Sequence, residues 1–330
     1  MKCRELMKLE NTGHQGINSI FSKAHSADWD IDRDVDWSTP VEPDDSLVDH
    51  EWTAFGRTPT FQALPAEVRH YVTRRGLGRV LNILQVGESV AQDVCAKLAL
   101  GLRHEDHRNA AVAQAMDEAR HHLAYVRFLE KMGEEPEDID PFTEDMFDTL
   151  LATEEPRRLI AFEQFYLESM AMNIFEGIHD HATNPLLKDI LALITRDESR
   201  HMGFGVLYLA EWMKEASLDD RIRFANAWLP RILFTVEDRP GPLMLRQVLR
   251  RIEEAGYPDA AKLAPDLLRE QQERNAEEHA RVLDGTKPSH LLKSAKNVGL
   301  LAPEITDALG LSDHPLVQAG RRVGDGAPAS

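Results

Sequence analysis

Two copies of one short pattern constrain the fold of this chain more than any other feature of its sequence. Asp117-Glu118-Ala119-Arg120-His121 returns 80 positions later as Asp197-Glu198-Ser199-Arg200-His201. The same offset relates Glu88-Ser89-Val90-Ala91 to Glu168-Ser169-Met170-Ala171. The chain thus presents twice a single glutamate that is followed, 30 positions later, by Glu-x-x-His. So long a period predicts that one helical hairpin has been duplicated, and argues against a short-period solenoid.

Apolar residues recur three and four positions apart from Pro65 onward, a spacing that is typical of amphipathic helices. Glycine and proline clusters divide this pattern into segments, and no segment alternates with period two. The sequence therefore predicts an all-α fold. The expected helices lie near 65–102, 106–132, 142–153, 156–182, 185–215, 218–237, 242–255 and 258–284.

We expect three parts along the chain. Residues 1–60 carry many Asp, Trp and Pro residues with little helical period, which indicates an extended segment with one short helix near 17–21. Residues 61–285 are expected to form one helical domain. Residues 286–330 end in a stretch rich in glycine and proline, and are predicted to be a loosely held tail.

The spacing of the acidic residues predicts that they meet. Residue 103, midway between Glu88 and Glu118, falls in the break between the first two long helices. Residue 183, midway between Glu168 and Glu198, falls in the break between the second two. The two glutamates of each antiparallel hairpin are therefore expected at the same height. Because a glutamate and a histidine three apart share one helix face, two packed hairpins would bring four glutamates and two histidines together.

Such a cluster is the composition of a dinuclear metal site. Buried carboxylates without countercharge would cost several kcal/mol each or would bind protons. Two divalent cations remove this problem, and carboxylate and imidazole donors without thiolate favour iron or manganese. One glutamate from each of two helices, with Glu-x-x-His from each of two others, is the known composition of di-iron carboxylate bundles.

Glu-x-x-His on its own is a weak motif. With 29 Glu and 14 His in 330 residues, random placement gives roughly one such pair. Four occur, namely Glu67/His70, Glu118/His121, Glu176/His179 and Glu198/His201. We interpret the first as a solvated first turn and the third as a helix end, while the duplicated context selects the other two as metal-binding.

Charge and cysteine content exclude several classes of function. The formal net charge is −18, so nucleic acid and anionic membranes are poor partners. The two cysteines, Cys3 and Cys95, cannot build a disulfide framework or a thiolate metal site. There is no secretory signal and no apolar stretch long enough to span a bilayer, so a cytoplasmic location is expected.

The duplicated Asp-Glu-x-Arg-His motif resembles the oxygen-activating branch of the ferritin-like dinuclear iron carboxylate superfamily. It is similar to the hydroxylase subunits of bacterial multicomponent monooxygenases, and the chain length is closer to ribonucleotide reductase small subunits and their ligand-binding oxidase relatives. The resemblance implies a ferritin-like four-helix bundle with additional C-terminal helices. It also implies six metal ligands: Glu88, Glu118, His121, Glu168, Glu198 and His201.

Around these ligands the resemblance implies a second layer of polar residues. Asp117 and Asp197 would accept the ring N–H groups of the ligating histidines. Arg120 and Arg200 would pair with the two aspartates. The alternative for all four is an ordinary salt bridge on a helix surface.

Three positions distinguish this chain from the subfamilies that it resembles. Tyr125, four residues after His121, occupies the place of the radical tyrosine in reductase small subunits, although a buried core tyrosine is the commoner case. The ligand-binding oxidases carry a crosslinked tyrosine where this chain has Glu163, so that crosslink is expected to be absent. The monooxygenases place a threonine where this chain has Met172.

Residues three, four or seven positions from the ligands are expected to line a pocket beside the metals. These are Leu84, Cys95, Gln164, Phe165, Met172 and Phe175. Their mostly apolar character favours a hydrophobic or aromatic organic substrate, although apolar residues at helical spacing are also ordinary core.

The resulting prediction is an oxidoreductase with two iron ions, or a manganese–iron pair, that uses dioxygen on a small organic substrate. Hydroxylation, N-oxygenation and desaturation are the expected reactions. An external electron donor, either a ferredoxin or a flavin reductase, and a homodimer are expected partners. The alternatives are a radical generator similar to a ribonucleotide reductase small subunit, and a ferroxidase or other iron-handling protein.

Overall fold

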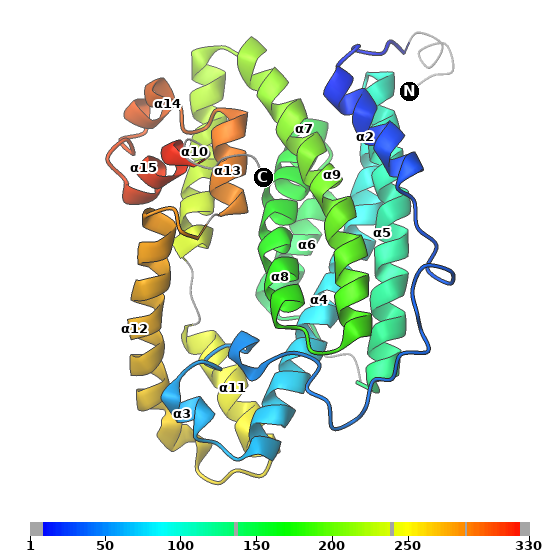
Figure 1. The fold of residues 1–330 in the computed structure, drawn as a ribbon. Helices are drawn as coiled ribbons and strands as arrows, with labels where there is room; N and C mark the ends of the chain where they lie inside the picture. Colours follow the sequence, from blue (N-terminus) through cyan, green and yellow to red (C-terminus); the bar gives the residue numbers. More distant parts are fainter. Residues whose placement is uncertain (1–8, 135–137, 238–240, 288, 324–330) are drawn as a thin grey trace.

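Four long segments, α4, α5, α8 and α9, lie side by side in the computed structural model and form its central bundle (Figure 1). The structure describes residues 9–134, 138–237, 241–287 and 289–323. The helices up to the end of the bundle are α2 Gln15–Ser26, η1 His50–Trp52, α3 Pro59–Gln62, α4 Ala66–Gly101, α5 Glu105–Met132, α6 Pro141–Ala152, α7 Pro156–Ile160, η2 Ala161–Leu167, α8 Glu168–His181 and α9 Pro185–Glu215. They are followed by α10 Leu218–Glu237, α11 Pro242–Glu254, η3 Ala260–Leu263, α12 Ala264–Leu283, α13 His290–Val298, α14 Pro303–Ala308 and α15 Pro315–Arg322. The prediction of an all-α fold is confirmed.

Local sequence fixes where the bundle helices begin and end. α5 ends at Gly133, whose φ of 67° lies in the left-handed region that favours glycine. α9 begins after Asn184, whose side chain accepts the Leu187 backbone N–H at 3.2 Å. Pro185 occupies its first turn, where no helical hydrogen-bond donor is needed. Within the described residues, β pairing is limited to one bridge between Val48 and Ala182.

The core of the bundle is divided along its length. One apolar cluster contains Leu98 of α4 and Phe204 of α9, and a second contains Leu81 of α4 and Ile190 of α9. On both helices the glutamates of the duplicated motifs fall between the two clusters. Apolar packing above and below therefore holds a polar layer at mid-height, where water is largely excluded.

In residues 9–60, α2, η1 and the beginning of α3 are joined by turns and irregular stretches, and α2 packs against α5 and α9 (Figure 1). The short helix expected near 17–21 is therefore present and longer than predicted.

The prediction of a loosely held tail over 286–330 was wrong for the part that the structure describes. Three short helices, α13 to α15, lie there beside α10. They bury Leu292 and Leu316 completely or nearly so in the larger apolar cluster. Each helix is too short to show a strong period in the sequence, and it is stabilised by tertiary packing. Residues 324–330 of the predicted tail lie outside the described residues.

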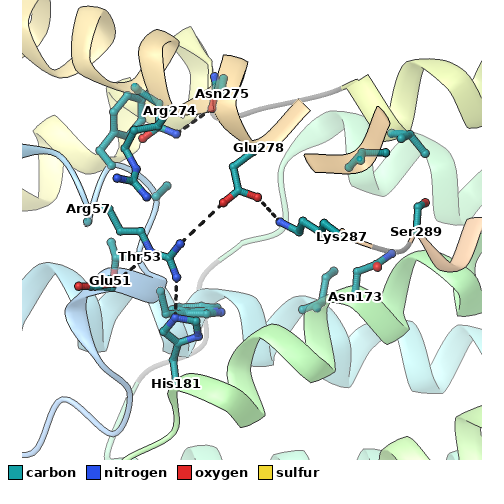
Figure 2. Close-up of a pocket in the computed structure, with 18 of the residues that line it drawn as sticks. Glu51, Thr53, Arg57, Asn173, His181, Arg274, Asn275, Glu278, Lys287 and Ser289 are labelled. Carbon is teal, nitrogen blue, oxygen red and sulfur yellow. Dashed lines mark hydrogen bonds and ion pairs between the residues drawn. The ribbon is translucent and has the colours of Figure 1, made fainter. Parts of the chain in front are cut away.

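A cavity of about 470 Å³ opens between residues 51–57, α8 and α12 (Figure 2). We call it the outer cavity. Trp52, Arg57, Arg274 and Glu278 are among the residues that line it. In the described part of the chain, no helix is both long and apolar enough to cross a membrane.

Candidate metal centre

The four glutamates and two histidines of the duplicated motifs converge inside the bundle. Glu88 comes from α4, and Glu118 and His121 from α5. All six side chains are buried, with Glu118 and His121 fully inaccessible to solvent. Carboxylates buried to this extent are stable only when a proton, a hydrogen-bond donor or a cation neutralises them.

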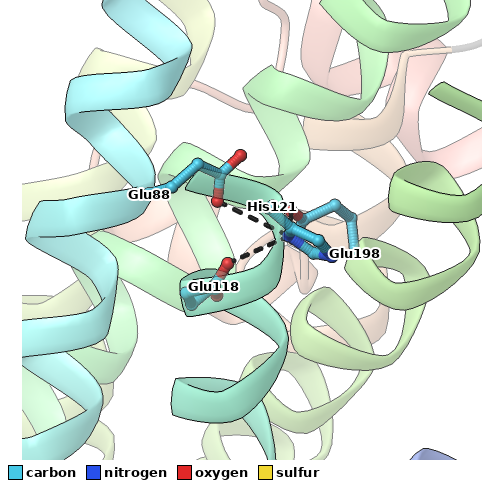
Figure 3. Close-up of side chains that lie close together, drawn as sticks. All are labelled: Glu88, Glu118, His121 and Glu198. Carbon is cyan, nitrogen blue, oxygen red and sulfur yellow. Dashed lines mark ion pairs between the residues drawn. The ribbon is translucent and has the colours of Figure 1, made fainter. Parts of the chain in front are cut away.

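The cluster consists of two overlapping groups of four residues, and each group has donor atoms within 4.8 Å of one another. The first group contains Glu88, Glu118, His121 and Glu198 (Figure 3). The second contains Glu118, Glu168, Glu198 and His201. Glu118 and Glu198 belong to both groups.

The shared glutamates present one oxygen to each histidine. Glu118 Oε2 lies 3.2 Å from His121 Nδ1, and Glu118 Oε1 lies 3.2 Å from His201 Nδ1. Glu198 Oε1 lies 3.0 Å from His121 Nδ1, and its Oε2 lies 2.8 Å from His201 Nδ1. Two carboxylates that span two imidazoles in this way have the form of bridging ligands.

The remaining two glutamates each belong to one group. Glu88 Oε2 lies 3.5 Å from His121 Nδ1, and Glu168 Oε1 lies 3.8 Å from His201 Nδ1. They therefore have the arrangement of terminal ligands.

The ring orientation of both histidines suits metal binding. His121 Nε2 lies 3.3 Å from Asp197 Oδ2, and His201 Nε2 lies 3.0 Å from Asp117 Oδ2. Because a carboxylate accepts the Nε2–H, the neutral ring has its lone pair on Nδ1, which faces the glutamates. His121 Nδ1 and Glu118 Oε2 are buried without a hydrogen-bond partner among the described residues. The donor set thus fits two cations.

The electrostatics of the metal-free cluster lead to the same conclusion. Burial, reinforced by the Glu198 carboxylate, raises the pKa values of Glu88 and Glu168 well above the ordinary value. Burial opposes charge on the two imidazoles, but the surrounding carboxylates outweigh it and raise the pKa of each. Without metal ions, protons on Glu88, Glu168 and the two imidazoles therefore offset the negative charge of the buried carboxylates.

Arginine and tryptophan side chains support the two aspartates. Arg200 Nη2 donates to Asp197 Oδ1 at 2.8 Å and to Asp117 Oδ2 at 3.1 Å. Arg120 pairs with Asp117. Trp29 Nε1 donates to Asp197 Oδ2 at 2.7 Å, and the Arg120 guanidinium lies 4.9 Å from the centre of the Trp29 ring. The four residues that sequence analysis placed around the ligands thus form one connected network, which is buried except for the partly exposed Arg120.

Sequence analysis missed two members of this environment. Trp29 lies 168 positions from Asp197, and nothing in the local sequence indicates the contact. Gln114 Nε2 donates to Glu118 Oε1 at 2.8 Å and to Glu168 Oε1 at 3.0 Å. Its position one helical turn before Glu118 could have revealed it.

A π-helical segment precedes Glu168 and changes which residues face the site. This segment, η2, covers Ala161–Leu167. A π-helix has more residues per turn than an α-helix, so Glu163 points to the same side as Glu168, five positions later. A Cβ at Gly205 of α9 would lie 2.7 Å from the Gln164 carbonyl carbon, so glycine allows this close approach.

Glu163 lines a second cavity of about 110 Å³, the inner cavity, together with Glu88, Glu168 and Glu198. The remaining wall is almost entirely apolar and includes Phe147, Leu167, Met170 and Ile174. Glu163 is 5% exposed, and among the described residues its Oε2 has no hydrogen-bond partner. Burial, reinforced by the nearby Glu118 and Glu198 carboxylates, raises the pKa of Glu163 to about 8.

The predicted pocket residues are only partly found in this cavity. Leu84 and Phe175 line it. Cys95, Gln164, Phe165 and Met172 do not line it and are buried in the core instead. The prediction for Gln164 and Phe165 assumed an α-helical register, which η2 does not follow.

Tyr125 is 1% exposed, and among the described residues its hydroxyl has no hydrogen-bond partner. It packs in the apolar cluster that also holds Leu81 and Ile190.

The two other Glu-x-x-His pairs lie outside the site. Glu176 is half-exposed and pairs with His290 Nε2 at 3.0 Å, while Glu67 is exposed in the first turn of α4.

Two comparisons with known proteins gave matches. The family model described as P-aminobenzoate N-oxygenase AurF matches residues 10–239. An R2-like ligand-binding oxidase from Sulfolobus acidocaldarius is similar in structure, with a TM-score of 0.49 and 14% sequence identity. The similarity covers 75% of this chain and 91% of that chain. None of the curated proteins matches the sequence.

Proposed function

This chain belongs to the P-aminobenzoate N-oxygenase AurF family, and on that premise we propose that it transfers one oxygen atom from dioxygen to the nitrogen of a small aromatic amine. Family membership makes the protein a non-haem di-iron oxygenase of the ferritin-like superfamily, with two iron ions, dioxygen and a small organic substrate. It confirms the resemblance inferred from the duplicated motif.

In this proposal the metals are held by six residues. Glu118 and Glu198 would contribute to both metal positions, with His121 and Glu88 at one and His201 and Glu168 at the other. Reduced iron in such a site supplies the chemistry that activates dioxygen. Asp117 and Asp197 orient the histidines, and the apolar layers around the cluster exclude water.

The observation that carries N-oxygenation over hydroxylation or desaturation is the position of Glu163. An apolar substrate for hydroxylation or desaturation gains nothing from a polar group, whereas this inner cavity contains the buried carboxyl group of Glu163, whose Oε2 has no hydrogen-bond partner among the described residues. Such a group calls for a partner from outside the protein. An aromatic amine can donate an N–H to its oxygen or accept a hydrogen bond from its O–H, and either contact would place the nitrogen near the cluster.

The reaction balances with an external reductant. One dioxygen, two electrons and two protons convert an aromatic amine to its hydroxylamine and one water. We propose that a ferredoxin or a flavin reductase supplies these two electrons. The homodimer and the cytoplasmic location stay predictions.

The test is a product analysis with isotopically labelled dioxygen. Iron-loaded protein, a chemical reductant and p-aminobenzoate should yield a hydroxylamine that carries one labelled oxygen atom on nitrogen. The matched control is Glu198→Gln, in which a bridging carboxylate is lost. Oxygen on a ring carbon, or product formed equally by the control, would contradict the proposal.

A further inference from the structure

The outer and inner cavities share one wall. Met170 and Ile174 of α8 line both of them. The two residues lie one helical turn apart, so they present neighbouring side chains on one face of α8. Methionine has three rotatable side-chain bonds and adapts readily. A partition of two apolar side chains therefore separates a chamber of about 470 Å³ from one of about 110 Å³ beside the cluster.

The outer cavity carries an excess of positive charge. Its lining includes three cations, Arg57, Arg274 and Lys287, and two anions, Glu51 and Glu278. The whole chain has a formal net charge of −18, so a positive chamber goes against the overall balance.

Two of the three cations are already paired within the protein. Glu278 lies between Arg57, at 3.8 Å, and Lys287 (Figure 2). Arg57 also lies 3.2 Å from Glu51 and donates to His181 Nε2 at 2.9 Å. The positive charges of Arg57 and Lys287 are therefore balanced by carboxylates of the protein itself.

Arg274 is different. Among the described residues it has no ion-pair partner within 4.0 Å, although it lies on the cavity wall. A single guanidinium without a carboxylate suits one monoanion, and its planar fork matches a carboxylate with two parallel hydrogen bonds. The rest of the lining includes Trp52 and Leu291, which offer apolar surface to the body of the same molecule.

We propose that the outer cavity is an entry chamber that binds the carboxylate of an amphipathic organic acid on Arg274, with Met170 and Ile174 as the gate to the inner cavity. This inference rests on the proposed function and deepens it, because it assigns the place where the acidic end of the substrate binds before its other end reaches the cluster. The acid binds first with its charged end on α12, and its uncharged end then passes α8 toward the cluster.

Binding measurements on iron-loaded protein without oxygen test the proposal. Calorimetric titration with p-aminobenzoate and with its neutral analogue p-aminobenzamide isolates the contribution of the charge. We expect wild-type protein to bind the acid at least about tenfold more tightly than the amide, as for one charge-assisted hydrogen bond. Arg274→Gln should abolish this preference, and Arg274→Lys should retain part of it.

The matched control is Arg269→Gln, because Arg269 lies on the same helix, is exposed and pairs with Asp266 outside the cavity. It should keep the preference for the acid. Equal binding of acid and amide by wild-type protein, no measurable binding of the acid, or an unchanged preference in Arg274→Gln would overturn the proposal.

The gate has its own readout. Met170→Phe should lower kcat/KM for the acid several-fold with a much smaller change in its dissociation constant, because Met170 lines both cavities whereas the charge contact lies on Arg274. Lower affinity together with unchanged turnover would contradict the order of the two chambers. If Arg274 governs binding but no hydroxylamine forms, only the proposed reaction fails. If hydroxylamine forms with no effect of Arg274→Gln, only the entry chamber fails.

Discussion

His201 Nε2 lies 3.0 Å from Asp117 Oδ2, so the aspartate of the first motif contacts the histidine of the second. The reverse contact joins Asp197 to His121. In sequence each aspartate lies four positions before the histidine of its own motif, yet in space it serves the other hairpin. The two halves of the duplication are therefore coupled directly beside the proposed ligands.

This crossed pairing predicts the effect of Asp117→Asn. An amide accepts the His201 N–H less strongly than a carboxylate does, so the ligating nitrogen becomes less basic. We expect iron affinity to fall about 10- to 100-fold, measured by competition with a chelator. Asp93→Asn, an exposed aspartate on α4, is the control and should bind iron as the wild type does. Unchanged affinity in Asp117→Asn would show that the contact has no role in metal binding.

The bridging arrangement predicts the stoichiometry of two further variants. Glu118 and Glu198 each belong to both groups of donors. Glu118→Gln and Glu198→Gln should therefore weaken both metal positions, and each variant should retain fewer than one iron per chain. Metal analysis after anaerobic loading and desalting measures this. Glu67→Gln, from the unrelated Glu-x-x-His pair, should retain both irons. The ligand assignment would be refuted by two irons per chain in both bridging variants.

Tyr125 supplies a test of the radical alternative. Its hydroxyl is buried with no partner among the described residues, so Tyr125→Phe should raise the free energy of unfolding by about 1 kcal/mol. We expect N-oxygenation to persist and the paramagnetic resonance spectrum after oxygen exposure to match that of wild type. Tyr71→Phe is the control for the substitution itself. A tyrosyl radical signal that disappears only in Tyr125→Phe would favour the radical generator.

His107 predicts part of the pH dependence of stability. It is 5% exposed, and burial lowers its pKa below the ordinary 6.5 despite the neighbouring Asp106. His104 and His14 lower it further, and the Tyr208 ring packs at its edge. Below pH 6.5 the unfolded chain therefore binds a proton that the folded chain does not. This histidine destabilises the fold as the pH falls through that range.

The measurement compares denaturant unfolding at about pH 7.5 and about pH 5.5. His107→Gln should lose less stability than wild type over this interval. His25→Gln, which replaces an exposed histidine, should behave as wild type does. An equal loss in His107→Gln and wild type would rule out this contribution.

The sequence was sufficient to predict the bundle and the convergence of the six residues, because both follow from helical period and from turns centred between paired glutamates. It could not predict the crossed aspartates, since four residues of local spacing suggest a contact within each motif. The contact of Trp29 with Asp197 could not be predicted either, because the two residues lie far apart in the sequence and Trp29 lies outside the helices. The prediction assumed a regular α-helix before Glu168. The π-helical η2 shifts the facing positions by one residue, so Glu163 lines the inner cavity in place of Gln164.

Glu163 carries the most specific prediction about the substrate. Within the part of the chain that the structure describes, the Oε2 atom of the buried carboxyl group has no hydrogen-bond partner, so an amine in the inner cavity gains a contact that a methyl group cannot provide. We expect p-aminobenzoate to bind more tightly than p-methylbenzoate, and Glu163→Leu to reverse this preference, because a buried amine would then be left unpaired. Glu163→Gln keeps the shape and one acceptor, so it should retain part of the preference.

Iron content separates this role from metal ligation. Both Glu163 variants should still bind two irons, whereas kcat/KM for the amine should fall at least about tenfold in Glu163→Leu, as expected when a buried polar contact is lost. Glu154→Gln, at a side chain that is 83% exposed, is the matched control and should leave both quantities unchanged. Loss of iron from Glu163→Gln would instead make Glu163 a ligand. An unchanged ratio of affinities for the amine and methyl compounds would remove the reason to prefer nitrogen as the atom that is oxygenated.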